Sequence, residues 1–567
     1  MSDKNGKAYD AIIVGSGATG GFAAKELTER GLEVLVLEAG PYLKDALWDA
    51  KWHMKGIDVI PRVIGTLEGQ HIQARLSFYG KETKFMFVND RKNPYTCPPD
   101  SFYLWARGRN VGGRFLSFGR VLMRMSDYDF KCASNDGWGE DWPISYDELI
   151  PYYDHVEEFL GVVGSNEGIP NLPDGKYSAK AGLSRVEKQL KETVESTWPD
   201  RKVVPWRYVR KGAMPKDSKG DRTTSPLVAA ERTGRLTLRP NSVVSKINID
   251  PATGKATGVT YIDANSKQTF TASANVVMLC SSTIESIRLL LNSACSKHPN
   301  GVGNSSGLLG RYFMDQCPAL LFGAATGTTG WEQVDTQDGD ENHGGLYIPR
   351  FQNLGRVTHL DFKRGFNIQG MAGRGWVPDD SPTQFGFMGQ GEMLPHYENY
   401  VSIDPRKRDA WGIPAPHIKL SMTENEVKLL RCEFNTIKEM VRKMGWTQDF
   451  GGSSLGLDNS KNILPHANPL VRALFRATFK KSMGLGASIH EVGGARMGSD
   501  PGKSVLNAKN QCWDATNVFV TDGSSFVSNG TCGPALTIMA LTTRACEYIA
   551  GEYGKSIELS SSALRSV

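Results

Sequence analysis

The segment that decides the fold spans residues 9–38 and reads YDAIIVGSGATGGFAAKELTERGLEVLVLE. Tyr9–Val14 is a short apolar run typical of a buried strand, and Gly20–Arg30 carries apolar residues at helical spacing. Gly31 stops that helix, and Glu33–Leu37 is typical of a second buried strand. The order predicts one βαβ unit with a glycine-rich turn between its first strand and its helix.

The glycines of this turn suit a dinucleotide cradle. Gly15 permits a tight turn, Gly17 lets the backbone approach a pyrophosphate, and Gly20 lets the helix pack on the strand. Glu38 ends the second strand 18 residues after Gly20, where its carboxylate is placed to accept from ribose hydroxyls. We expect Ala18, Thr19 and Ala39 to contact the same cofactor.

A second signal lies near the other end of the chain. Residues 490–498, HEVGGARMG, precede an apolar strand at Val518–Thr521 and a helix that begins at Pro534. They place one histidine, His490, in a glycine-rich turn. On its own such a histidine is more often a satisfied core residue, but the surrounding motif favours a catalytic base.

Bulk properties narrow the class of protein. The 567 residues exceed what one hydrophobic core usually supports, so we expect two domains. The net charge of +5 is small and interspersed, which argues against a nucleic-acid partner. No apolar run is long enough to span a membrane. Nine scattered cysteines without a Cys-x-x-Cys pair, and no room for a signal peptide before Tyr9, predict a reduced cytoplasmic protein without a metal site.

Further segments give the organisation of the chain. A glycine-rich stretch precedes a helix, a strand meander and a second helix, and later short strands are followed by a capped helix. The glycine-rich stretch is Arg107–Arg120, and the helices on either side of the meander are Tyr146–Gly161 and Ile284–Leu291. The meander is expected to have three or four strands, over Val243–Ile249, Gly258–Ile262, Gln268–Thr271 and Asn275–Leu279. The later short strands fill the antiparallel region 318–421, and the capped helix is opened by Thr423–Glu426 and closed by Gly445.

The order of these motifs, with residues 107–113 (RGRNVGG), His490-x-x-Gly and residues 522–524 (DGS), resembles the glucose–methanol–choline (GMC) family of FAD oxidoreductases. The resemblance covers essentially the whole chain and is weak over 45–95 and 318–400. Residues 496–498 and 535–542 are similar to the branch that oxidises sugars and sugar acids, which includes pyranose oxidases and gluconate or glucoside dehydrogenases.

The resemblance implies an α/β fold, α+β overall, with two domains. A Rossmann-type FAD-binding domain comprises residues 1–44, 96–165, 225–317 and 480–567. An antiparallel-sheet substrate-binding domain covered by helices comprises 166–224 and 318–479. Residues 45–95 are expected to form an irregular excursion, either a lid, an oligomer contact or a plain surface insertion.

The resemblance also implies cofactor contacts. Gly112 and Gly113 bring backbone against the flavin, Val244 contacts adenine through its main chain, and the segment from Ser281 runs near the cofactor. Further expected contacts are Arg107, Asp522 and Gly523. Some members attach FAD through a histidine at the position of Ser117, whose hydroxyl is not set up for such a bond, so we predict non-covalent FAD.

The start of the last helix adds an electrostatic argument. Pro534 suits the first helical position, and Ala535 and Leu536 follow it. If the family placement holds, the helix N-terminus stabilises negative charge on the reduced flavin.

His490 is the expected catalytic base. Oxidising an alcohol removes a hydroxyl proton and a carbinol hydride, and an imidazole of ordinary pKa, about 6.5, suits the proton transfer near neutral pH. The family usually places a second histidine or asparagine 43 residues later in several members, where this chain has Gly533. Asn529 is our candidate replacement; His417 and His466 are nearby alternatives that more often would be structural.

The leading prediction is an FAD-dependent oxidoreductase that oxidises a secondary CH–OH group of a sugar, glycoside or polyol to a ketone, with hydride passing to flavin N5. The electron acceptor is expected to be dioxygen or a quinone-like compound. The sequence allows assembly as a homo-oligomer or with a small partner subunit. The alternatives are a redox-silent FAD-containing lyase and a catalytically degenerate flavin-binding subunit.

Overall fold

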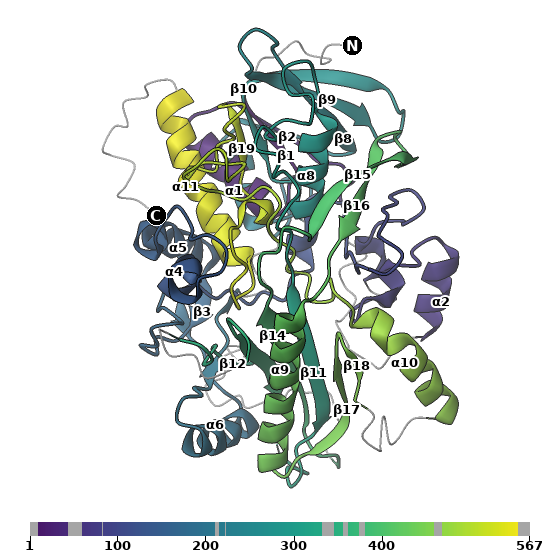
Figure 1. Ribbon diagram of the computed structural model, residues 1–567, viewed down its shortest axis with the longest axis vertical. Coiled ribbons are helices and arrows are strands. Elements are labelled where there is room, and N and C mark those ends of the chain that lie inside the picture. The colour runs from purple at the N-terminus through teal and green to yellow at the C-terminus, as the bar shows by residue number, and fades with distance from the viewer. Residues whose placement is uncertain are drawn as a thin grey trace.

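The computed structural model describes residues 9–43, 59–81, 83–209, 215–221, 223–331, 345–354, 361–373, 380–458 and 468–553. Two seven-stranded sheets dominate it, one in the upper half of Figure 1 and one in the lower half. The helices pack around these sheets, so the fold is the expected mixture of helices and sheets.

The first sheet is mixed, with strand order β7-β2-β1-β10-β9-β8 and β19 beside β10. Its central strands β1, β2 and the second half of β10 run parallel and are mostly apolar and buried, as strands covered on both faces require. The strands are β1 (Tyr9–Val14), β2 (Val34–Leu37), β7 (Leu236–Arg239), β8 (Ser242–Ile249), β9 (Ala256–Asp263), β10 (Thr269–Leu279) and β19 (Val518–Val520).

Of the two expected forms of the meander, three strands or four, the structure has three. β10 is continuous, pairing antiparallel with β9 from Thr269 to Ser273 and parallel with β1 from Ala274 to Leu279. Its first half alternates between buried and exposed residues and its last four residues are all buried. The change of pattern marks a change of environment along one strand and not a turn.

Four helices pack together beside the first sheet, and a fifth joins it to a hairpin. α1 (Ala18–Glu29) packs against α7 (Ser225–Arg232) and α11 (Ala535–Tyr553), and α11 packs against α5 (Tyr146–Leu160). α8 (Thr283–Asn292) contacts β8 and the hairpin of β15 (Tyr400–Arg408) and β16 (Pro414–Lys419). The predicted helices at the two ends of the chain are thereby confirmed and lie side by side.

The second sheet is antiparallel, with order β18-β17-β11-β14-β13-β12-β5. α9 (Glu424–Lys443), with the predicted capping box at Thr423 and Glu426, covers one face. A Cβ at Gly391 would lie 2.2 Å from Leu429 of α9, so glycine lets the helix approach the sheet. The strands are β5 (Val204–Pro205), β11 (Gln316–Ala324), β12 (Leu346–Ile348), β13 (Phe366–Ala372), β14 (Gln384–Glu392), β17 (Thr447–Ser453) and β18 (Gly456–Leu457).

The remaining elements surround these two layers. The expectation that residues 45–95 are irregular was wrong for part of the segment, which contains α2 (Val59–Leu67). The other elements are α3 (Asp127–Phe130), α4 (Cys132–Asp136), α6 (Arg185–Thr197), α10 (Pro469–Ser482) and a small sheet of β3 (Val162–Gly164), β4 (Ala179–Lys180) and β6 (Tyr208–Val209). The division into domains stays a prediction.

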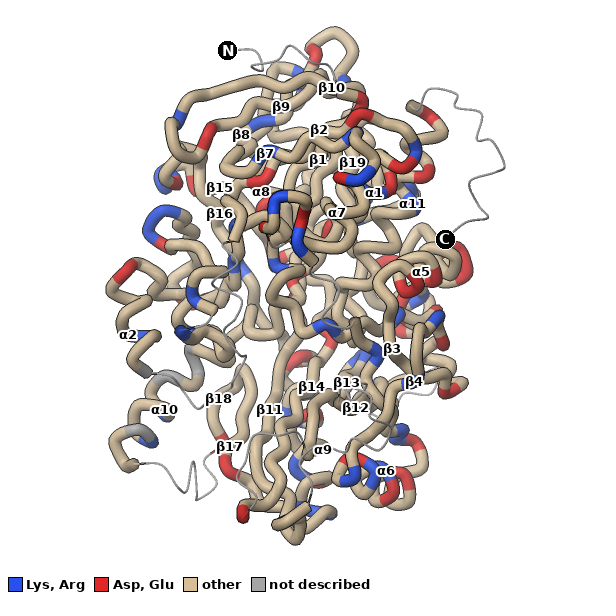
Figure 2. Tube along the Cα trace, turned by 180° about the vertical axis from the view of Figure 1, so that it is seen from behind, with Lys and Arg blue, Asp and Glu red and all other residues tan. Residues whose placement is uncertain are grey.

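The structure also shows where the charged residues and the cysteines of the chain lie. Figure 2 shows basic and acidic residues interspersed along the chain. Among the described residues, none of the helices combines the length and apolarity needed to cross a bilayer, and no three metal-ligating side chains cluster. All nine cysteines are free thiols.

Candidate functional site

The glycine-rich turn between β1 and α1 has the geometry that its sequence predicts. Gly15 has φ +96°, and a Cβ there would lie 2.5 Å from the carbonyl oxygen of Cys280. A Cβ at Gly20 would lie 2.0 Å from the carbonyl oxygen of Gly15, so helix and strand touch. A Cβ at Gly17 would meet nothing within 4 Å. The helix N-terminus therefore opens onto free space at Gly17, where an anion can approach the backbone.

Glu38 fixes this turn from the end of β2. Its carboxylate accepts from the backbone N–H (3.0 Å) and hydroxyl (2.6 Å) of Ser16 and from the N–H of Gly40 (2.9 Å). The Ser16 hydroxyl in turn accepts from the N–H of Gly112 (3.1 Å). Burial raises the pKa of Glu38, although these bonds and the charge of Arg109 act against the rise. Oε1, which accepts only from Gly40, keeps acceptor capacity for a ligand.

A groove runs along this turn and brings together residues from five separate parts of the sequence. The predicted cofactor contacts that line it are Gly15, Gly17, Glu38, Ala39, Arg107, Gly113, Val244 and Ser281. Gly112 and Gly113 have φ of +87° and +51°, and a Cβ at Gly113 would lie 3.1 Å from Cα of Gly17. The two glycine loops therefore meet at the groove, and a side chain at Gly113 would press against the backbone of Gly17.

Arg107 supplies a buried cation to this groove. Its guanidinium lies 4.3 Å from the ring centroid of Trp105 and 3.5 Å from the Asp90 carboxylate, and burial lowers its pKa to about 10. Two of its nitrogens, Nε and Nη2, have no hydrogen-bond partner within the described ranges. Spare buried donors beside a helix N-terminus fit the pyrophosphate of a dinucleotide such as FAD.

The predicted contacts Asp522 and Gly523 lie beside the groove and are occupied by protein partners. Asp522 accepts from the hydroxyl of Ser286 (2.5 Å) and from the hydroxyl of Ser524 (2.6 Å), and Ser286 also bonds Ser281 at 2.8 Å. A Cβ at Gly523 would lie 2.7 Å from the hydroxyl of Thr283. These residues pack α8 against the loop before α11 and support the groove wall at Ser281.

His490 is held by Asp315 and Gln316, at the start of β11. Its backbone N–H donates to the Asp315 carboxylate (3.1 Å), and its Nδ1 lies 2.6 Å from Oε1 of Gln316. The amide nitrogen of Gln316 donates to the carbonyls of Gly530 (3.0 Å) and Cys532 (3.1 Å). The two carbonyls can only accept, so the end of the Gln316 amide that faces them must be its nitrogen. Oε1 therefore accepts from Nδ1–H of His490, which leaves the lone pair of the neutral imidazole on Nε2.

Gly533 lies at that lone pair. A Cβ at Gly533 would be 3.2 Å from Nε2 and 3.3 Å from Cε1 of His490, with no other atom within 4 Å among the nearest neighbours. His490, Gly533, Pro534 and Ala535 are all half-buried, whereas Thr531, Cys532 and Leu536 are buried. The Nε2 edge of the imidazole therefore lies beside Gly533 in the half-buried turn at the N-terminus of α11.

The site depresses the basicity of His490. Burial, together with the positive charge of Arg114, lowers its pKa to about 4. Arg114 pairs with Glu491 at 2.5 Å, and burial and the charge of Glu491 raise the pKa of Asp315 to about 7. The pKa of His490 is therefore lower than the ordinary imidazole value of about 6.5 expected from the sequence, because the ring is buried. The histidine is neutral at physiological pH.

The other predicted residues stand as follows. Asn529 is fully buried, and in the described part of the chain neither end of its amide has a hydrogen-bond partner. His417 bonds Thr96 at 2.8 Å on β16, and His466 lies outside the described residues. The hydroxyl of Ser117 donates to the carbonyl of Arg114 at 3.3 Å. Ala18, Thr19 and Leu536 lie in the first turns of α1 and α11.

Carboxamides line the sheet face that looks toward this loop. Gly391 faces α9, so the alternate residue Gln390 points to the opposite face of β14. Asn367 is its partner on β13, lies 3.4 Å from it, and donates to the carbonyl of Thr531. With Gln316 on β11, three buried carboxamides approach residues 530–532. The sequence analysis missed all three.

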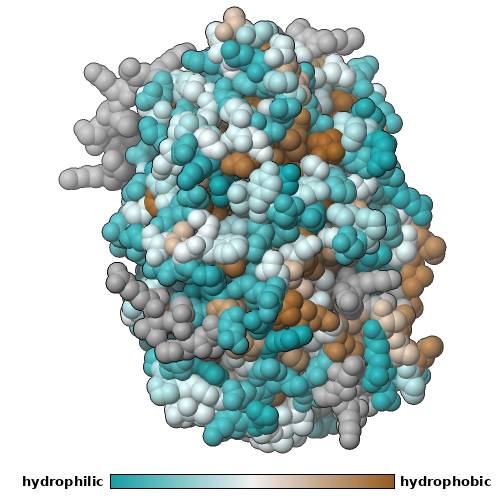
Figure 3. Space-filling view, in the orientation of Figure 1, coloured by the Kyte–Doolittle hydropathy of each residue, from teal (hydrophilic) through white to brown (hydrophobic). Residues whose placement is uncertain are grey.

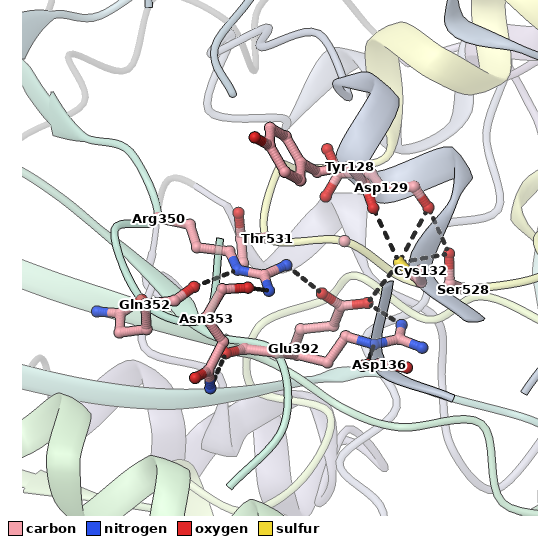
Figure 4. A network of polar contacts seen from close by, with 12 residues as sticks. Tyr128, Asp129, Cys132, Asp136, Arg350, Gln352, Asn353, Glu392, Ser528 and Thr531 are labelled. Atoms are coloured by element: carbon pink, nitrogen blue, oxygen red, sulfur yellow. Dashed lines mark hydrogen bonds and ion pairs between the residues drawn. The ribbon is translucent and has the colours of Figure 1, made fainter. Parts of the chain in front are cut away.

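A buried polar network holds the same loop from behind (Figure 4). The hydroxyl of Ser528 donates to the carbonyl of Asp129 (3.1 Å) and lies 3.8 Å from the thiol of Cys132. Glu392 of β14 pairs with Arg364 at 2.6 Å and lies 4.0 Å from the same thiol. The loop that presents Gly533 is thereby fixed between α3–α4 and the second sheet.

Comparisons with known proteins agree with this arrangement. Two GMC oxidoreductase family models match residues 9–308 and 395–542. The chain is similar to 2-methyl-1,2-propanediol dehydrogenase of Mycolicibacterium austroafricanum (26% identity, 97% of this chain and 96% of the relative). It is also similar to the fructose dehydrogenase large subunit of Gluconobacter japonicus (24% identity, 95% and 97%).

A solved structure shares the fold. Formate oxidase of Aspergillus oryzae, studied for its FAD modification, superposes with a TM-score of 0.62 at 14% identity over 96% of this chain and 99% of that chain. The family models cover both ends of the chain, where the two glycine loops, His490 and α11 lie. This chain therefore belongs to the GMC oxidoreductase family of flavoprotein oxidoreductases.

Proposed function

We propose that this protein oxidises a secondary CH–OH group of a sugar, glycoside or polyol to a ketone, with non-covalent FAD as cofactor and His490 as base. The observation that carries the proposal is the Nε2 lone pair of His490. It is fixed by Gln316 and faces Gly533 in the half-buried turn before α11.

The residues present fit FAD. Gly15, Gly17, Glu38, Arg107 and Val244 line a groove with an open helix N-terminus and spare guanidinium donors. When bound, FAD supplies the two-electron acceptor for the carbinol hydride. The N-terminus of α11 lies beside His490 and offers partial positive charge to an anion bound next to Gly533.

His490 accepts the hydroxyl proton at Nε2. Its pKa of about 4 keeps the ring neutral at physiological pH, so the acceptor lone pair is always available. A base this weak cannot remove the proton of a free alcohol in advance. The proton therefore leaves as the C–O bond gains carbonyl character and the hydroxyl becomes strongly acidic. Gln316 keeps accepting from Nδ1–H throughout and so orients the imidazolium.

The carboxamides of the second sheet support a polyhydroxylated substrate. Each offers a donor and an acceptor, which matches a hydroxyl group that both donates and accepts. Asn367 has an amide oxygen without a partner among the described residues, and so does Asn529, which also has a spare nitrogen. We assign Asn529 the second polar role that Gly533 cannot fill. The names of the similar dehydrogenases, of a propanediol and of fructose, agree with a polyhydroxylated substrate; the propanediol has a primary and a tertiary hydroxyl and no secondary one.

Two further assignments belong to the same proposal. The hydroxyl of Ser117 donates to a backbone carbonyl, and serine lacks the nucleophilic ring nitrogen through which a histidine would attach FAD. Both points support dissociable FAD. Nine free thiols support a reducing, cytoplasmic compartment.

Anaerobic mixing of the FAD-loaded protein with sugars, glycosides and polyols tests the proposal. At least one class should bleach the flavin absorbance, and reoxidation with dioxygen or a quinone then assigns the acceptor. A product formed without bleaching would establish a redox-silent lyase instead. If no alcohol gave either a product or bleaching, the protein would be a catalytically degenerate flavin-binding subunit.

A further inference from the structure

An apolar ridge lies on the outer face of α2 and on α10. It comprises Ile60, Val63, Ile64 and Leu67 of α2 and Leu470 of α10, which are 73%, 54%, 42%, 71% and 78% exposed. The four residues of α2 follow the spacing of one helix face. Surface helices normally turn such a face toward the core, so its exposure here calls for an external partner.

The outward orientation of α2 is fixed by its other face. Arg62 donates to the carbonyls of Ala74 (2.7 Å) and Leu76 (2.9 Å). A Cβ at Gly65 would lie 1.8 Å from the hydroxyl of Tyr79, so glycine allows the helix to sit directly on this residue. The helix is therefore anchored through a polar and glycine face, and its apolar face is left outside.

α10 continues the ridge. It contacts the short turn Gln73–Arg75 that follows α2, and the two helices lie beside each other at the right of Figure 1. In the same orientation, Figure 3 shows hydrophobic surface along that edge of the molecule. The ridge thus belongs to two elements that are far apart in the sequence.

The surroundings of the ridge are strongly basic. Residues 59–95 and 468–482 contain ten Lys or Arg and three Asp or Glu, whereas the whole chain has a net charge of only +5. Arg476 is exposed on α10, and Lys84, whose side chain is 34% exposed, pairs with Glu68 at 3.0 Å. Two copies of this chain meeting here about a two-fold axis would bring like charges together. An anionic lipid surface instead satisfies both the apolar residues and the positive charge.

We propose that the ridge of α2 and α10 docks the protein on the surface of an anionic lipid bilayer. The apolar side chains enter the boundary between headgroups and acyl chains, and the surrounding cations contact the lipid phosphates. The docked face is linked to the candidate site by one packed cluster, in which Ala74, Leu76 and Tyr79 lie with Ile489, the residue before His490. The proposal stands independently of the reaction assigned to His490.

Cosedimentation of the full, FAD-loaded chain with lipid vesicles tests this inference. The probe vesicles contain equal parts of phosphatidylcholine and phosphatidylglycerol, and the reference vesicles contain phosphatidylcholine alone. The wild type should bind the anionic vesicles on the order of tenfold more tightly and be released by high salt. The variants I64E/L67E and L470E should lose binding on the order of tenfold.

A matched control separates the ridge from any added charge. Tyr397 is 44% exposed outside the ridge, so Y397E adds the same single charge as L470E and should bind like the wild type. Unchanged flavin content and melting temperature show that the ridge variants are folded. Failure of the wild type to bind anionic vesicles, or equal binding by I64E/L67E, would overturn the proposal. So would a wild-type dimer in sedimentation velocity that I64E/L67E dissociates, because the ridge would then be an interface between copies.

Discussion

Replacing Gln316 by leucine perturbs the candidate site without touching the imidazole itself. The leucine side chain has a similar volume, so packing against the loop is largely kept. It removes the acceptor of Nδ1–H of His490 and the donor that serves the carbonyls of Gly530 and Cys532. His490 then has no fixed tautomer, and a proton on Nε2 would make it unable to act as base.

The size of the effect follows from the three hydrogen bonds. Each buried group left without a partner costs about 1–3 kcal/mol, so Q316L should destabilise the fold by about 3 kcal/mol or more. Loss of a partner that orients a functional imidazole costs roughly 10–100-fold, and a fully wrong tautomer costs about 10⁴-fold. We expect the rate of flavin reduction to fall at least about 10²-fold.

Stopped-flow flavin reduction at saturating substrate measures this rate, and thermal unfolding measures the stability. Asn517 gives a matched control, because its amide donates to the carbonyls of Ala256 and Asn275 (both 2.7 Å) and accepts from the N–H of Ala256 (2.8 Å) on the first sheet. N517L should lose similar stability and keep the wild-type rate once folded. A Q316L enzyme that reduces its flavin as fast as N517L would refute the role of Gln316.

Three further predictions concern the same site. G533A places a Cβ 3.2 Å from Nε2 of His490, so flavin reduction should slow on the order of tenfold at unchanged flavin content; an unaltered rate would show that substrate does not use this edge. Because the pKa of His490 is about 4, kcat/KM should stay level from neutral pH downward and fall only near pH 4, whereas an acid limb near 6.5 would contradict the lowered pKa. G17L meets no protein atom within 4 Å of its Cβ but enters the groove, so it should fold normally and purify with little flavin; full flavin content would place the pyrophosphate elsewhere.

Local sequence patterns predicted the helices and strands that are determined by residues close to one another in the sequence. The βαβ unit follows from an apolar run, a glycine turn and a helical repeat within residues 9–38. The helix α9 follows from the capping box of Thr423 and Glu426. The position of Gly533 beside His490 followed from the spacing of the family motif, and the geometry agrees with it.

Features that depend on distant partners could not be predicted in this way. Gln316 meets His490 from 174 positions away, and the only local hint is a polar pair, Asp315 and Gln316, at the start of an apolar strand. The lowered pKa of His490 depends on burial and on Arg114, which a sequence pattern does not show. The sequence did not decide between three and four strands for the meander, because the environment of β10 changes halfway along the strand.

The most direct test of the account compares wild type and H490A in anaerobic flavin reduction by a substrate that bleaches the wild type. If Nε2 of His490 takes the hydroxyl proton, H490A should bind FAD normally and reduce it about 10²–10⁴-fold more slowly at neutral pH. Reduction of the flavin in H490A at the wild-type rate would contradict the central claim.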